Sequence, residues 1–283
     1  MAIVLPRFGG AVPPTLFDSS IPKTVRTLKA ACGVAVENDM GKLDGKVVVI
    51  TGGGSGVGKA VALLFLAEGA KVVIAGRDAA KLTAVATEAA AGDRLRTVPT
   101  DVTSAAQCES LIQTATEAFG RVDILVNNAG TNLKARTIRE LTPESWDVMI
   151  RTNLDGAFYC TKAVLQQMLD RKDGVIVNVV SVAGKRANPL GGAAYVAAKF
   201  GMGGLGLVLS NEEKDSGVRV SNIYPGEIDT PILAARPKPL SDEQRALILK
   251  PEDVAAAVLF VASLPPRVSI PELVIKPTAQ MYW

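Results

Sequence analysis

Short, continuously apolar runs alternate with helix-length segments from Gly41 to the end of the chain. The apolar runs are rich in β-branched residues and occupy residues 46–51, 71–76, 95–100, 122–127, 174–180, 218–224 and 272–276. The segments between them are rich in Ala, Leu and Glu and occupy residues 57–69, 79–91, 104–119, 142–171, 192–215 and 251–263. A strand that is apolar on both faces is buried on both, which requires a parallel sheet with helices on each side. The pattern therefore predicts one doubly wound α/β domain over residues 41–283.

Residues 1–40 do not follow this pattern. They contain four prolines and the pair Gly9-Gly10, and they lack the unbroken apolar region of a secretory signal. Their basic residues outnumber the single acid before Glu37, as in some transit peptides. We expect an N-terminal extension of unknown role, and we favour an appendage that packs on the domain or its neighbour over a transit peptide.

The composition excludes several kinds of chemistry. The 283 residues include no histidine, which rules out Ser-His-Asp and Cys-His catalysis and His-ligated metals. The net charge of +3 is too small to indicate a nucleic-acid or membrane-surface partner, and no apolar run approaches the ~20 residues that cross a bilayer. The three cysteines form no C-x-x-C motif, which favours reduced thiols over a metal site. We expect a cytoplasmic protein without a metal.

A glycine-rich loop, Thr51 to Gly58, follows the first apolar run and opens a helical segment. Glycines in this place let backbone N–H groups and a helix N-terminus approach a phosphate. The G-x-G-x-x-G fingerprint is satisfied in no register, and a P-loop match fails at Ala60, where Ser or Thr should bind magnesium. The loop therefore predicts a nucleotide site other than that of an NTPase, with a glycine turn that binds no ligand as the alternative.

The end of the second apolar run indicates which nucleotide is bound. An acid at this point binds an adenosine ribose hydroxyl and selects NAD, but the chain has Gly76 there, followed by Arg77. A guanidinium suits the 2′-phosphate of NADP, while Asp78 is expected to cap the next helix. NADP(H) is favoured and NAD(H) stays possible, because Arg77 can also be a solvated surface charge.

Tyr195 and Lys199 are four residues apart on a predicted helix, so they share one face. A free phenol, with a pKa near ~10, is a poor base at neutral pH. A neighbouring ammonium favours the phenolate and makes the tyrosine a usable acid/base. The spacing alone occurs often by chance, so its significance depends on the motifs around it.

Those motifs resemble the short-chain dehydrogenase/reductase family, in its single-domain branch of about 250 residues. Besides the glycine loop and YVAAK at 195–199, they are Asp101-Val102, NNAG at 127–130, Asn153, Ser181 and PGEIDT at 225–230, in the family's order over residues 41–283. The resemblance implies a Rossmann-like sheet of about seven strands. It also implies a homo-oligomer, which we expect to be a tetramer, with the segments at 142–171 and 192–215 in the main contact.

The resemblance also implies roles for individual residues. Tyr195 exchanges a proton with the substrate oxygen, Lys199 lowers the pKa of Tyr195 and binds the nicotinamide ribose, Ser181 orients the carbonyl, and Asn153 supports a water that links Lys199 to solvent. Asn127 is expected to tie strands together. The cofactor would contact Gly52, Ser55, Gly56, Val57, Gly58, Arg77, Asp101, Val102, Asn128, Ala129, Gly130, Tyr195, Lys199, Pro225, Gly226, Ile228 and Thr230.

Three functions follow from these expectations. The first is an NADPH-dependent reductase of a ketone, including a 3-oxoacyl thioester, and the second is an NAD-dependent dehydrogenase of a polyol, sugar or hydroxy acid. The third, a cofactor sensor without activity, is disfavoured by the complete set of four catalytic residues. Residues 231–250 are expected to form a substrate lid. Basic residues at the pocket mouth either favour an acidic substrate or are solvated surface charges; they are Lys185, Arg186, Arg236, Lys238 and Arg245. Glu227 either meets the substrate or points to solvent.

Overall fold

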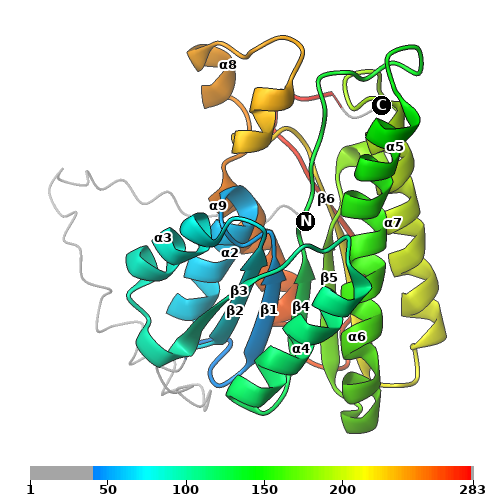
Figure 1. Ribbon diagram of the computed structural model, residues 1–283. Helices are drawn as coiled ribbons and strands as arrows, with labels where there is room; N and C mark the ends of the chain where they lie inside the picture. Colours follow the sequence, from blue (N-terminus) through cyan, green and yellow to red (C-terminus); the bar gives the residue numbers. More distant parts are fainter. Residues whose placement is uncertain (1–40, 282–283) are drawn as a thin grey trace, which may run out of the picture. The chain divides into compact units, whose positions relative to one another are not determined.

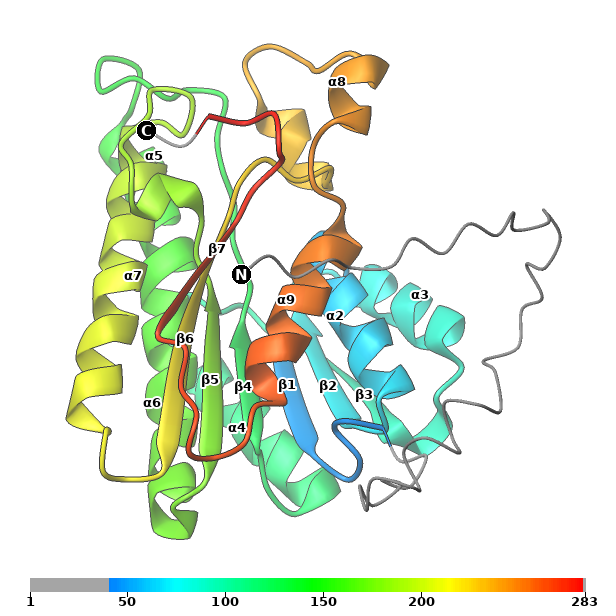
Figure 2. The ribbon, with the colours of Figure 1, turned by 180° about the vertical axis from the view of Figure 1, so that it is seen from behind.

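Seven parallel strands form one sheet in the order β3-β2-β1-β4-β5-β6-β7 in the computed structural model, which describes residues 41–281 (Figures 1 and 2). The strands are β1 (Val47–Thr51), β2 (Lys71–Gly76), β3 (Leu95–Pro99), β4 (Ile124–Asn127), β5 (Gly174–Val179), β6 (Val218–Pro225) and β7 (Glu272–Ile275). Each predicted strand is present, with ends that differ by at most two residues. The expected extension at 1–40 and Cys32 lie outside the described residues.

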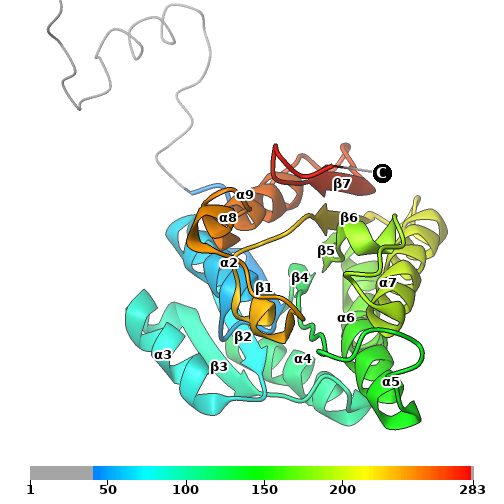
Figure 3. The same cartoon turned by 90° about the horizontal axis from the view of Figure 1, so that it is seen from above.

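Helices cover both faces of the sheet, which confirms the doubly wound prediction (Figure 3). Val48 and Ile50 of β1 belong to the core on one face, under α2 (Gly56–Ala67), α3 (Ala79–Ala89) and α9 (Pro251–Ala262). Val49 belongs to the core on the other face, under α4 (Ala105–Phe119), α6 (Gly156–Arg171) and α7 (Ala193–Glu212). This alternation along one strand is the side-chain period of a sheet that is buried on both faces.

The single helix predicted at 142–171 is interrupted. It consists of α5 (Pro143–Ile150), a π-helical turn at Arg151–Asp155 and α6. The Thr142 hydroxyl caps the first turn in a capping box with Ser145, and Pro143 lies in that turn. The sequence analysis did not predict four short elements. They are the 3₁₀ turns at Gly92–Arg94, Val182–Gly184 and Pro231–Ala235 and the helix α8 (Asp242–Ala246).

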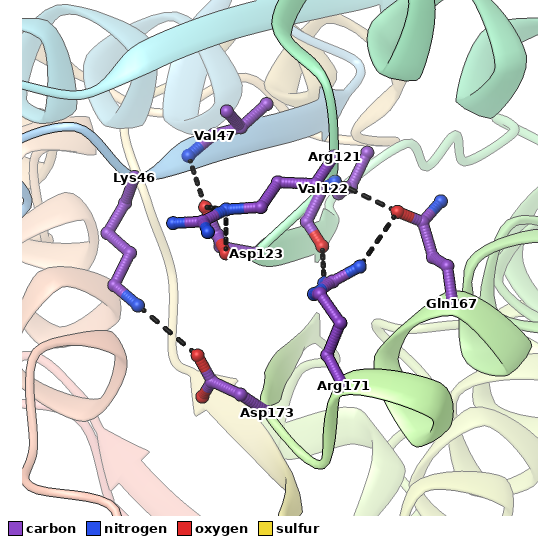
Figure 4. A network of polar contacts seen from close by, with 8 residues as sticks. All are labelled: Lys46, Val47, Arg121, Val122, Asp123, Gln167, Arg171 and Asp173. Carbon is purple, nitrogen blue, oxygen red and sulfur yellow. Dashed lines mark hydrogen bonds and ion pairs between the residues drawn. The ribbon is translucent and has the colours of Figure 1, made fainter.

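A polar network joins the elements at the amino ends of the strands (Figure 4). The buried Asp123 carboxylate accepts a hydrogen bond from the backbone N–H of Val47 at 2.8 Å and pairs with Arg121 at 2.9 Å. Arg171 of α6 donates to the carbonyl oxygen of Val122 at 2.6 Å. Because buried carboxylates are stable only when paired and hydrogen-bonded, this network fixes β1, β4 and α6 at the edge of the sheet away from the glycine loop.

Three buried asparagines form a ladder across β4, β5 and β6. The side chain of Asn127 donates to Asn178 at 3.0 Å, Asn178 donates to Asn222 at 2.9 Å, and Asn222 donates to the carbonyl oxygen of Gly203 in α7 at 2.9 Å. Asn127 therefore ties strands together, as expected. The ladder ends on α7, so it fixes the height of that helix above the sheet.

Glycines of α7 allow this close approach. A Cβ on Gly206 would lie 2.1 Å from Oδ1 of Asn222, and one on Gly203 would lie 2.9 Å from the Tyr224 hydroxyl. A Cβ on Gly201 would meet Leu154 of the π-helical turn at 2.9 Å, whereas nothing lies within 4 Å of a Cβ on Gly204.

The apolar helix α7 is partly buried against the sheet. By length and composition it is the one helix among residues 41–281 that would suffice to cross a membrane, but it packs on β6, which is typical of a core helix. Two cysteines far apart in sequence, Cys108 and Cys160, also meet in the core between α4 and α6. The hydrogen bond with Cys108 and, after it, burial raise the pKa of the Cys160 thiol.

Replacing Gly206 with Ala tests the contact between α7 and the ladder. We expect Gly206→Ala to lower the free energy of unfolding by about 2 kcal/mol or more, because the new methyl group overlaps Asn222. The cost should be smaller when Asn222→Ala is already present, since that change removes the clashing oxygen. Urea unfolding of the two single variants and the double variant measures the coupling; strictly additive costs would show that the contact is unimportant.

Candidate active site

The glycine loop lies between β1 and α2, next to β4, where the strand order of the sheet reverses. Gly52 and Gly56 have positive φ, +67° and +52°, and a Cβ on Gly58 would lie 2.3 Å from the carbonyl oxygen of Gly52. Ser55 is the N-cap of α2, and its side chain makes no capping hydrogen bond. The first N–H groups of α2 are thus available to a phosphate, and the loop fits the nucleotide that the sequence predicts.

Asn128 and Thr51 hold this loop in place. The Asn128 side chain donates to the carbonyl oxygens of Thr51 and Gly52, at 3.0 and 3.2 Å. The Thr51 hydroxyl accepts the backbone N–H groups of Asn128 and Ala129, both at 3.0 Å. Asn128 therefore supports the glycine turn, and Thr51 is a supporting residue that the sequence analysis did not single out.

A groove of about 680 Å³, open to solvent, runs from the glycine loop past the carboxyl ends of β2 and β3. Many of the predicted cofactor residues line it, namely Gly52, Ser55, Arg77, Asp101, Val102, Ala129 and Gly130. Other lining residues were not predicted, namely Gly54, Lys81, Leu82, Thr100 and Thr152. An open groove at the switch point of a parallel sheet is where such folds bind nucleotides, so the residues present fit the dinucleotide that the sequence predicts.

Two cations stand at the outer end of the groove. Arg77 is exposed and makes no ion pair with any residue in 41–281. Lys81 is 3.3 Å from the carboxylate of Asp78, which accepts the backbone N–H of Lys81 as the cap of α3. These hydrogen bonds lower the pKa of Asp78. Asp78 therefore caps its helix as expected.

The segment at the end of β6 closes the groove on the opposite side. A Cβ on Gly56 would lie 3.2 Å from the Thr230 side chain, so the glycine loop and this segment face each other. Ile228 forms a bridge with Leu249, and the backbone N–H of Gly226 donates to the carbonyl oxygen of Ile275 in β7. Of the predicted residues in this segment, Thr230 thus lies across from Gly56, while Gly226 is joined to β7.

Three of the four predicted catalytic residues are fixed by contacts with the backbone, and two of them, Asn153 and Lys199, lie beside Gly130. Asn153, in the π-helical turn, donates to the carbonyl oxygens of Thr131 and Met149, at 3.1 and 2.9 Å. Lys199 of α7 donates to the carbonyl oxygen of Val179 at 2.9 Å. A Cβ on Gly130 would lie 3.0 Å from Oδ1 of Asn153 and 3.8 Å from Nζ of Lys199. The Ser181 hydroxyl accepts the backbone N–H of Ala183 at the end of β5.

Tyr195 lies one turn before Lys199, and the Lys199 nitrogen is 5.8 Å from the centre of its ring. Burial raises the pKa of Tyr195, while a hydrogen bond with Ser181 and the positive charge of Arg136 act to lower it. Burial also lowers the pKa of Lys199 to about 7. The pKa shift of Tyr195 is thus opposite to the one expected from Lys199, because burial dominates and the buried amine retains only part of its charge at neutral pH.

A narrow crevice adjoins Tyr195 on the side away from the glycine loop. Its lining includes Asn132, Leu133, Arg136 and Gly191. Nearby, Glu227 forms an ion pair with Arg236 at 3.0 Å, so Glu227 does not simply point to solvent. Arg136 was not predicted, because nothing in the local sequence distinguishes it from a surface arginine.

Besides Arg236, two more of the basic residues expected at the pocket mouth, Lys185 and Arg245, are paired with carboxylates of the chain itself. Lys185 pairs with Glu272 at 2.6 Å, and Arg245 pairs with Asp229 at 3.0 Å. Lys238 is exposed. Among residues 41–281, no group of three His, Cys, Asp or Glu side chains is placed to hold a metal ion.

Replacing Lys199 with Met tests the buried amine. Below about pH 7 the amine of Lys199 is protonated in both the folded and the unfolded protein, and the folded protein bears the full cost of burying the charge. Between about 7 and the ordinary value of 10.5 only the unfolded chain stays protonated, so the wild type gains stability as pH rises.

We subtract the free energy of unfolding of wild type from that of Lys199→Met. We expect this difference to fall by about 1 kcal/mol or more when the pH is raised from about 6.5 to about 9.5. Urea unfolding at both pH values measures the difference. A difference that does not change with pH would contradict a lowered pKa.

A family model described as short chain dehydrogenase matches residues 46–240. An uncharacterized oxidoreductase of Staphylococcus aureus is 37% identical over 235 residues, which cover 83% of this chain and 98% of the relative. The family match spans the glycine loop, the groove and the residues around Gly130.

Solved structures agree with this family. The closed form of serine dehydrogenase, complexed with NADP⁺, is 33% identical to this chain, with a TM-score of 0.76. The match covers 83% of this chain and 96% of the serine dehydrogenase chain. The 3-ketoacyl-(acyl-carrier-protein) reductase of Brucella melitensis, complexed with NADH, is 32% identical with a TM-score of 0.76 and covers 83% of this chain and 98% of its own. The chain therefore belongs to the short-chain dehydrogenase/reductase family and is an NAD(P)-dependent oxidoreductase.

Proposed function

We propose that this protein is an NADPH-dependent carbonyl reductase, with Tyr195 as the acid that protonates the substrate oxygen. The observation that carries the proposal is the meeting of Tyr195 and Lys199 with Asn153 around Gly130, at the inner end of the nucleotide groove. Similarity to a 3-ketoacyl-(acyl-carrier-protein) reductase and a serine dehydrogenase supports ketones and secondary alcohols as the substrate class.

The state of Tyr195 favours reduction over oxidation. Because burial raises its pKa, the phenol keeps its proton at neutral pH and is a donor to a carbonyl oxygen. The Ser181 hydroxyl, which hydrogen-bonds Tyr195, is placed to hold the same oxygen. Lys199, with a pKa of about 7, gains and loses a proton readily at neutral pH and can return one to Tyr195.

The cofactor supplies the hydride when it is bound, and the chain supplies position. The glycine loop and the N-terminus of α2 would hold the phosphates, and Ala129 and Gly130 would border the inner half of the groove. We propose that Arg77 and Lys81 select NADP over NAD, because two cations at the outer end suit a 2′-phosphate. Lys81 was not expected from the sequence.

The reduction itself is tested by Tyr195→Phe, which removes the proton donor and keeps the ring. We expect kcat for reduction of a ketone to fall by about 1,000-fold or more. The affinity for NADPH, measured by fluorescence titration, should stay within about twofold of wild type. Tyr159→Phe on α6 is the matched control and should leave both values unchanged; wild-type turnover by Tyr195→Phe would end the proposal.

The cofactor preference is tested by Arg77→Ala. We expect the Kd for NADPH to rise by about 10- to 100-fold, because charge-assisted hydrogen bonds to the phosphate are lost. The Kd for NADH should change by less than about threefold. Lys71→Ala, at the opposite end of β2, controls for a change in overall charge. Equal losses for both cofactors, or tighter wild-type binding of NADH, would favour the alternative of an NAD-dependent dehydrogenase.

The expected homo-oligomer, the cytoplasmic location and the absence of membrane and nucleic-acid partners stay predictions. Large apolar side chains that are exposed in the single chain, Phe158 on α6 and Phe200 and Val208 on α7, support the oligomer contact that the sequence analysis expected. Residues 231–250 include α8 and lie beyond the carboxyl ends of the strands (Figure 1), where a substrate lid is expected.

A further inference from the structure

Arg136 is bound to three separate loops beside Tyr195. Its Nε donates to the carbonyl oxygen of Leu133 at 3.1 Å, Nη1 donates to that of Leu190, and Nη2 donates to that of Ala235 at 2.8 Å. A guanidinium carries five N–H donors, so these contacts leave two of them for another acceptor. The side chain is half-buried and lines the crevice beside Tyr195.

The main chain of Arg136 is held as firmly as its side chain. Its carbonyl oxygen accepts the backbone N–H of Ala193, the first residue of α7, at 3.0 Å. A Cβ on Gly192 would lie 2.8 Å from the Cβ of Arg136. Arg136 is thus fixed against the turn of α7 that leads into Tyr195, and both residues line the same crevice.

The charge of Arg136 has no counterion within residues 41–281. The three acceptors of its guanidinium are neutral carbonyl oxygens. The nearby Glu140 carboxylate is occupied by the backbone N–H groups of Arg136 and Thr137, and Glu227 is paired with Arg236. Burial and the positive charge of Arg236 both lower the pKa of Arg136. A half-buried cation repelled by a neighbour is stabilised by an incoming anion.

We infer that the substrate carries a carboxylate, which the guanidinium of Arg136 binds while the carbonyl to be reduced faces Tyr195. This inference rests on the proposed function and narrows its substrate to small oxo acids. A planar carboxylate can take the two remaining N–H donors of a guanidinium together. Reduction adds a hydride to the keto carbon and a proton to its oxygen, and the carboxylate is unchanged in the hydroxy acid that forms.

A matched pair of substrates tests this inference, namely acetoacetate and its methyl ester, which differ in the charge. With NADPH, we expect wild-type kcat/KM to be about tenfold or more higher for the acid. Arg136→Gln should lower kcat/KM for the acid by about 10- to 100-fold more than it lowers kcat/KM for the ester. Arg139→Gln, an exposed arginine on the same loop, should change neither value.

The outcomes separate this inference from the proposed function. Equal losses for acid and ester in Arg136→Gln would overturn it, because Arg136 would then only tie loops together. A wild type that reduces the ester and not the acid would overturn it too, while leaving the proposed reductase intact. A wild type that binds NADPH and reduces neither the acid, the ester nor any other ketone would instead remove the proposed function.

One measurement needs no variant and so does not depend on whether Arg136→Gln folds. Butyrate has a carboxylate and no ketone, so we expect it to compete with the methyl ester for wild-type protein. Butyramide, which is uncharged and of similar shape, should inhibit at least about tenfold more weakly. Equal inhibition by the two compounds would contradict a carboxylate site.

Discussion

The contact between α7 and the asparagine ladder determines where the proposed catalytic residues Tyr195 and Lys199 lie. Gly203 and Gly206 bring the helix so close to the sheet that Asn222 donates directly to its backbone. Tyr195 and Lys199 are on the same helix, so their height above β5 and β6 follows from this contact. The amide groups of the ladder are buried and depend on one another, since each donates to the next. A substitution at Gly203 or Gly206 would therefore move Tyr195 and Lys199 without changing any residue of the candidate site.

The two edges of the sheet are built differently. At the amino ends of the strands, buried Asp123 satisfies its charge with Arg121 and the backbone of Val47. At the carboxyl ends, some hydrogen-bond donors have no acceptor among residues 41–281. They belong to the first N–H groups of α2 and to the guanidiniums of Arg77 and Arg136. Donors that are left to water can exchange it for an anionic ligand, whereas a charge already paired within the chain cannot. This asymmetry is the physical reason why ligands are expected at one edge and not at the other.

Much of the fold could be predicted from the sequence, because strands buried on both faces are apolar throughout and local caps such as Asp78 and Pro143 act within a few residues. The π-helical turn that holds Asn153 could not, since one extra residue in a helix leaves no compositional signal. Nor could the role of Arg136, whose carbonyl partners include residues 54 and 99 positions away. The pKa of Lys199 follows from burial, which only the packed structure determines.

The two ends of the segment between Ile228 and Leu249 are in contact with each other. These two residues form a bridge, and Asp229 pairs with both Arg245 and Lys250, so the ends of the loop are joined independently of what lies between them. A loop closed in this way can change in length or composition while β6 and α9 keep their places. The outer part of the segment, around α8, can therefore change independently of β6 and α9, whereas Ala235 and Arg236 are bound by Arg136 and Glu227.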